Sequence, residues 1–172
     1  MIMRIIFLFF LFISCVNDPN VIQDFALTEE LPIESITDAE LIQTQQGVVK
    51  LRILAGSMIR YSNVDSLLHL CDIVVTFYNN KQKSSVLAAN NASIDEKKKI
   101  MTASGNVVLE NKKNKLETEK LIWDERSQKI YTEEQVKITN QEETIFGEGF
   151  SSNADFTEYK ISKIHGNLDI SF

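Results

Sequence analysis

Two histidines and two cysteines are the side chains of this 172-residue sequence best suited to metal binding or nucleophilic chemistry. Metal centres and catalytic sites need several such groups brought to one point. His69 and His165 are solitary, so we expect both to be structural or surface residues. The sequence therefore predicts no metal site, no cofactor and no enzyme activity.

Charged side chains gather in short runs that we interpret as solvated turns. These runs are Glu133 and Glu134, Glu142 and Glu143, the lysines 97 to 99, and Lys112, Lys113 and Lys115. Phosphate binding at the lysine runs is the alternative. The formal net charge of −6 argues against nucleic acid as a partner, because neutralising its phosphates requires an excess of clustered cations.

The first residues have the pattern of a secretory signal. Arg4 precedes an apolar run over residues 5–13, which fits a signal peptide and is too short for the roughly 20 residues of a membrane span. Residues 12–15, Phe-Ile-Ser-Cys, resemble a lipobox, in which cleavage leaves an acylated cysteine as the first residue. We expect Cys15 to be lipidated; the alternative is a cysteine that merely lies near a cleavage site. Two or more acyl chains give stable membrane anchoring.

Three segments follow from this pattern: a lipoprotein signal peptide over 1–14, a lipidated tether over 15–35 and one folded domain over 36–172. The tether is polar and contains both prolines of the chain. With Cys15 committed to lipid, Cys71 has no disulfide partner, and we expect it to be a small core residue of a strand.

From residue 47 onward, apolar and polar residues alternate in short runs, which is the pattern of half-buried strands. The runs recur at nearly equal intervals, with Val107, Val136 and Leu168 in equivalent places. Turns are predicted at 62–63, 95–98, 124–128 and 153–155, and glycines 105, 147, 149 and 166 are expected in turns or bulges.

One such unit cannot cover its own apolar face, so successive units must stack. The pattern predicts an all-β fold in which two antiparallel sheets face each other, or one strongly twisted sheet folds over. We expect the resulting apolar interior to be an open trough without caps.

Three phrases resemble one family of repeats. Residues 102–109, Thr-Ala-Ser-Gly-Asn-Val-Val-Leu, resemble the "a-x-G-n-V" signature of the organic-solvent-tolerance repeat, which LptA, LptC and the N-terminal domain of LptD share. Residues 116–123 resemble its next strand, and residues 144–150 its "G-x-G" strand. The resemblance covers residues 47–172. One amino-terminal anchor and one repeat domain look like the LptC family, although a lipidated Cys15 would replace the uncleaved membrane helix of better-known members.

The resemblance implies a twisted antiparallel β-jellyroll that carries lipopolysaccharide at the periplasmic face of the inner membrane. It implies that the permeases of an inner-membrane ABC transporter supply the lipid and that an LptA-like periplasmic jellyroll receives it. The alternative is a structural envelope lipoprotein that uses its sheet edges only for assembly. A hydrolase is disfavoured, because the sequence offers no catalytic cluster.

The alternation places a set of apolar side chains in the interior, where we expect them to hold acyl chains, with a closed core as the alternative. They are Leu51, Ile53, Ile73, Val75, Leu87, Met101, Val107, Leu109, Leu116, Leu121, Trp123, Val136, Ile138, Phe146 and Phe150.

The last seven residues contain neither proline nor lysine and are expected to form an edge strand that pairs with the next jellyroll. They are Gly166, Asn167, Leu168, Asp169, Ile170, Ser171 and Phe172. We expect the opposite edge, near residues 36–46, to face the transporter.

Overall fold

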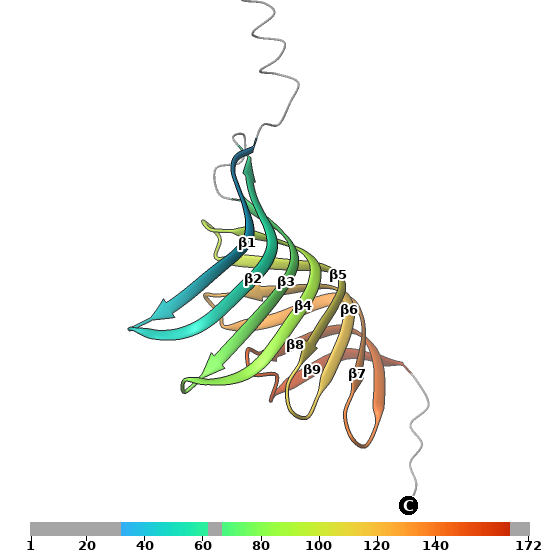
Figure 1. The fold of residues 1–172 in the computed structure, drawn as a ribbon. Coiled ribbons are helices and arrows are strands. Elements are labelled where there is room, and N and C mark those ends of the chain that lie inside the picture. Colours follow the sequence, from blue (N-terminus) through green and yellow to red (C-terminus); the bar gives the residue numbers. More distant parts are fainter. Residues whose placement is uncertain (1–31, 62–66, 166–172) are drawn as a thin grey trace, which may run out of the picture. The chain divides into compact units, whose positions relative to one another are not determined.

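The computed structural model describes residues 32–61 and 67–165. These residues form one antiparallel sheet of nine strands, in which each strand lies beside its neighbours in the sequence (Figure 1). The strands are β1 (Pro32–Gln45), β2 (Val48–Tyr61), β3 (Leu67–Asn79), β4 (Gln82–Asp95), β5 (Ile100–Glu110), β6 (Lys115–Asp124), β7 (Lys129–Thr139), β8 (Thr144–Asn153) and β9 (Tyr159–His165). The predicted all-β, twisted antiparallel fold is confirmed.

Strand β1 begins at Pro32, before the expected start of the domain at 36 and inside the segment expected to be tether. Proline is compatible with this place, because among the described strands β1 lies at the edge of the sheet and pairs on one side only, with β2. The other domain limits predicted from the sequence lie outside the described residues.

Most strands break their in-and-out alternation near the middle. In β3, Leu70 and Ile73 are buried, whereas the two residues between them, Cys71 and Asp72, are both exposed. Asp72 has a φ of 52°, typical of a bulge rather than of a regular strand. Corresponding shifts in strand pairing occur between residues 88 and 91, 104 and 107, 118 and 122, and 132 and 135.

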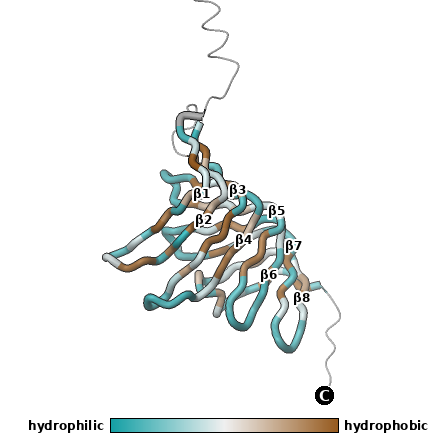
Figure 2. The backbone as a smooth tube through the Cα atoms, viewed as in Figure 1, coloured by the Kyte–Doolittle hydropathy of each residue, from teal (hydrophilic) through white to brown (hydrophobic). Residues whose placement is uncertain are grey.

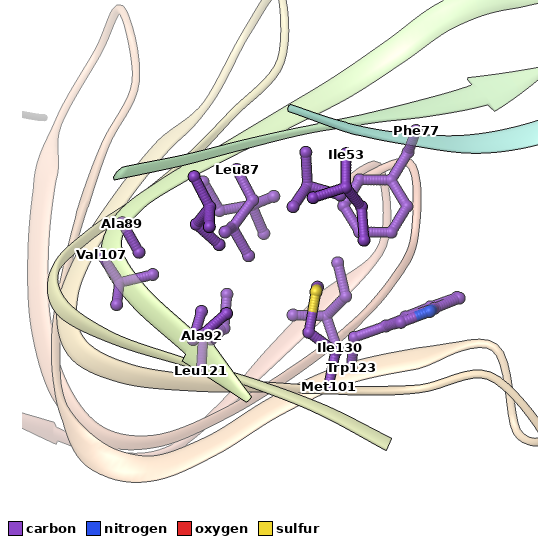
Figure 3. Packing of buried hydrophobic residues seen from close by; sticks show 14 of the residues in the cluster. Ile53, Phe77, Leu87, Ala89, Ala92, Met101, Val107, Leu121, Trp123 and Ile130 are labelled. Atoms are coloured by element: carbon purple, nitrogen blue, oxygen red, sulfur yellow. The ribbon is translucent and has the colours of Figure 1, made fainter. Parts of the chain in front are cut away.

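This row of irregularities is the line along which the sheet folds over, because each bulge bends its strand. The two halves of each strand then face each other. Leu87 and Ala92, which both belong to β4, lie on opposite sides of the interior (Figure 3). The bulge also explains why Cys71 is exposed, which corrects its expected place in the core.

The core lies between the two halves. Val75, Leu109, Leu116 and Ile138 have no exposed surface, and burial of such a side chain stabilises the fold by roughly 1.5–3 kcal/mol. Hydrophilic residues occupy most of the turns, and hydrophobic residues alternate with other residues along the strands (Figure 2). The folded sheet therefore has hydrophilic turns exposed to solvent and a hydrophobic interior.

The turns repeat with the strands. The side chains of Asp95 and Asp124, which occupy equivalent places in successive turns of one rim, each accept hydrogen bonds from the backbone N–H groups two and three residues later. At the opposite rim Asn111 and Asn140 form an equivalent pair and do the same. The predicted turns at 95–98 and 124–128 are confirmed. The turn predicted at 153–155 extends to residue 158, and the one at 62–63 lies outside the described residues.

Candidate binding groove

A groove opens where the two halves of the folded sheet stand apart. Its inner part has a volume of about 250 Å³ and is lined mainly by aliphatic side chains. Leu41, Leu51 and Ile53 line it from β1 and β2, and Ile94 and Met101 from β4 and β5. These side chains continue into the buried core, so the groove is an opening of the interior to the surface.

A second hollow of about 330 Å³ adjoins the first, and four residues line both: Gln43, Leu51, Trp123 and Glu125. Its lining is more polar and includes Gln43, Lys50 and Asn79. The groove therefore passes from an aliphatic inner part to a polar outer part, and Trp123 lies at the boundary.

Trp123 is held at this boundary by its neighbours. In the sheet it pairs with Met101 on β5 and with Ile130 on β7. From the other half of the sheet Phe77 meets it edge to face, and Figure 3 shows the two rings on opposite sides of the interior. The indole is 6% exposed.

Charged residues surround the mouth of the aliphatic part. Asp95, Glu96 and Lys99 line it from the turn between β4 and β5. Glu96 accepts a hydrogen bond from Arg60 at 2.9 Å. The backbone N–H and then the ammonium group of Lys98 lower the pKa of Asp95. The mouth thus carries charges of both signs.

A loop closes another stretch of the interior. Phe156, between β8 and β9, is fully buried and packs against Phe150 and Tyr159. The loop is fastened to the facing half, because Ser85 donates to the Ala154 carbonyl at 2.5 Å and Asn111 donates to the Phe156 carbonyl at 2.8 Å. The expectation of a trough without caps is therefore wrong along this stretch.

The residues predicted for the interior separate into three groups. Leu51, Ile53, Met101 and Trp123 line the groove. Ten others are buried in the packed core: Ile73, Val75, Leu87, Val107, Leu109, Leu116, Leu121, Val136, Ile138 and Phe150.

Phe146 forms the third group. It is 50% exposed and lies beside Lys137 on the outer face, so its expected place in the interior is corrected. A regular strand would put residues 146 and 150 on the same face. The bulge at Gly149, with a φ of 77°, puts Phe150 inside and Phe146 outside.

Several groove residues were missed in the sequence. Leu41, Leu68, Ile94 and Ile100 lie near strand ends, where alternation is hard to read. Phe156 had a signal: it is a single aromatic residue within a polar turn, which is unusual unless the ring is buried.

The remaining predicted sites are not among the described residues that line the groove. Cys15 and the proposed edge residues Gly166–Phe172 lie outside the described residues. His69 and His165 are exposed, and His69 contacts the ring of Tyr61. Among residues 32–61 and 67–165, no group of acidic, histidine and cysteine side chains is arranged to hold a metal ion. The same residues include no helix long and apolar enough to cross a membrane.

Comparison with known families identifies the chain's relatives by family. The family model for LptC, described as lipopolysaccharide-assembly, LptC-related, matches residues 5–167. This range contains all nine strands. A comparison with curated proteins finds no match.

Proposed function

The chain belongs to the LptC-related lipopolysaccharide-assembly family, and from this premise we propose that the groove holds lipopolysaccharide acyl chains. Membership makes the chain a component of lipopolysaccharide transport in the periplasmic part of the cell envelope. The family is one of transport and binding proteins.

The observation that carries this proposal is the aliphatic inner part of the groove, which is continuous with the core. Each methylene group moved from water into such surroundings contributes about 0.8 kcal/mol. Contacts of this kind have no preferred direction, so an acyl chain can slide along the lining. A carrier that must both receive and release lipid needs that property.

The two edges of the sheet support transfer between proteins. Within the described residues, β1 and β9 each pair with one neighbour, so each leaves one side of its backbone free to add a strand from another chain. We propose that the carboxy-terminal edge, including Gly166–Phe172, pairs with an LptA-like jellyroll. The β1 edge would then face the permeases of the inner-membrane ABC transporter.

The anchor is a separate part of the proposal. We propose that residues 1–14 are removed as a signal peptide and that Cys15 carries the acyl chains that hold the protein at the inner membrane. Cys15→Ser should leave a longer precursor that takes up no labelled fatty acid. Processing of the Cys15→Ser chain to the same length as the wild type would contradict this part. Fractionation of labelled cells identifies the membrane.

The groove is tested by photocrosslinking in cells. A crosslinking amino acid at Ile53, in the groove, should capture lipopolysaccharide. The same amino acid at Lys137, whose side chain is 45% exposed on the outer face, is the matched control and should capture none. Capture at position 137 alone would favour the structural lipoprotein that uses its edges only for assembly.

A further inference from the structure

Trp123 is an exception among the buried polar side chains. The others each have a hydrogen-bond partner in the backbone: Ser85, Thr118, Thr132 and Ser152. Within the described residues, Trp123 Nε1 is the one buried side-chain nitrogen or oxygen without an acceptor or donor. A buried donor that lacks an acceptor destabilises a fold, so its presence beside a groove points to a ligand. Because the nitrogen has almost no exposed surface, the ligand must part the groove lining to reach it.

The position of the indole indicates which part of a ligand it would meet. Trp123 lines both the aliphatic inner part of the groove and the polar outer part. An acylated sugar has the same division, with an alkyl tail, a carbonyl group at the linkage and a hydroxyl-rich head. When the tail lies among Leu51, Ile53 and Met101, the linkage falls at the boundary that Trp123 occupies.

We propose that Trp123 donates its indole N–H to the carbonyl oxygen that links an acyl chain to the sugar. This inference rests on the proposed lipid-binding function and adds to it a defined polar contact. The hydrogen bond sets how deeply the chain enters, because the carbonyl stops at the indole while the methylene groups continue into the aliphatic part. The head then lies among polar residues such as Gln43 and Asn79.

One consequence is selectivity for acyl over alkyl chains. An ether-linked chain of equal length fills the aliphatic part equally well, yet its oxygen is a weaker acceptor than a carbonyl. A single hydrogen bond in a protein changes an equilibrium constant by about threefold to tenfold. The expected preference for the acyl form lies in this range.

The test compares two sugars that differ by one carbonyl oxygen. Methyl glucoside carrying a 6-O-octanoyl ester and methyl glucoside carrying a 6-O-octyl ether are titrated calorimetrically into the full chain. The wild-type protein should bind the ester about threefold to tenfold more tightly. Trp123→Phe keeps an aromatic ring without the N–H and should bind both probes with the affinity that the wild type has for the ether. Tyr131→Phe, which removes the polar group of an aromatic ring outside both parts of the groove, should keep the preference.

A spectroscopic measurement on the wild-type chain tests the indole contact even if the Trp123→Phe variant fails to fold. Trp123 is the only tryptophan, so the ¹⁵N-labelled protein has one indole N–H resonance. That resonance should move downfield with the ester and less with the ether.

Two kinds of failure are distinguishable. Equal affinity of the wild type for both probes, or an ester preference that survives in Trp123→Phe, overturns the indole contact and leaves lipid binding intact. If neither probe binds to the wild type, the lipid-binding groove itself fails, and the indole contact fails with it.

Discussion

Phe77 and Trp123 meet edge to face across the interior, with ring centroids 5.2 Å apart and ring planes inclined at 72°. Phe77 belongs to the half of β3 that leads into the turn before β4, and Trp123 to the half of β6 that leads into the turn before β7. The pair therefore joins the two halves of the folded sheet. It does so at the place where the groove begins, since Trp123 lines both parts of the groove and Phe77 the outer part.

Phe77→Leu should lower the free energy of unfolding by about 1–3 kcal/mol, because it removes an aromatic pair and leaves space in the core. It should also shift the emission of Trp123, the single tryptophan, to longer wavelength as water reaches the indole. Urea unfolding and fluorescence measure the two effects. Val74→Ala, on the outer face of the same strand, should change stability by less than about 0.5 kcal/mol. Equal stability of Phe77→Leu and wild type would show that the pair does not hold the halves together.

Phe156→Ala should cost about 3–5 kcal/mol, the usual range for a large aromatic side chain removed from a core. The reason is that the ring fills the space where the β8–β9 loop closes the interior. Glu158→Ala is the control, since this exposed side chain lies in the same loop and should have little effect. Denaturant unfolding measures the stability of the two variants. Similar unfolding midpoints would mean that the Phe156 ring does not stabilise the closure of the interior by the β8–β9 loop.

The strands could be predicted from the sequence because alternation over several residues is a direct consequence of one buried face. Val107 and Val136 occupy equivalent places in successive runs, and the structure adds a reason. The turn residues Asp95 and Asp124, and likewise Asn111 and Asn140, recur with the same spacing and make the same hydrogen bonds. Local turn chemistry and strand pattern thus agree.

The bulges limited the prediction. A bulge reverses which residues face inward, and most of these bulges carry no unambiguous residue type, so Cys71 and Phe146 were placed on the wrong face. The sequence also could not predict which inward-facing apolar residues line the groove and which pack in the closed core. Ile53 and Val75 follow the same alternation, yet Ile53 lines the groove and Val75 is fully buried. The difference depends on the distance between the two halves of the folded sheet, which alternation does not encode.

Gly147→Ala should loosen β9 from β8. A methyl group at Gly147 would lie 2.6 Å from the Lys163 carbonyl oxygen and in collision with the side chain of Ile161, so β9 must shift. Such overpacking costs about 1–3 kcal/mol, and faster hydrogen exchange in residues 159–165 should accompany it. Gly56→Ala is the matched control, because its nearest neighbour, Asp72, would be at an ordinary 3.4 Å. Unchanged exchange in β9 would contradict the prediction.

The turn aspartates should make stability depend on acid pH. The pKa of Asp95 is lowered first by the backbone N–H and then by the ammonium group of Lys98, and the pKa of Asp124 first by the Ser127 hydroxyl and then by the Arg126 N–H.

Because the folded pKa values are lowered, the ionised carboxylates favour folding. Their contribution is complete above about pH 4, the ordinary aspartate pKa, and is lost as the pH falls through the lower folded values.

The Asp95→Asn, Asp124→Asn double variant keeps an oxygen acceptor in each turn, as Asn111 and Asn140 do naturally. Because Asn carries no charge, the Tm of this variant should lie below the wild-type value at pH 7, approach it near pH 2, and fall less steeply between pH 5 and pH 2. The Glu142→Gln, Glu143→Gln variant removes the same number of charges from another turn, where these residues bond to Asn140 through their backbone groups. It should keep the wild-type slope. If it flattens the curve as much as the aspartate variant does, the pH dependence reflects net charge rather than the turn hydrogen bonds.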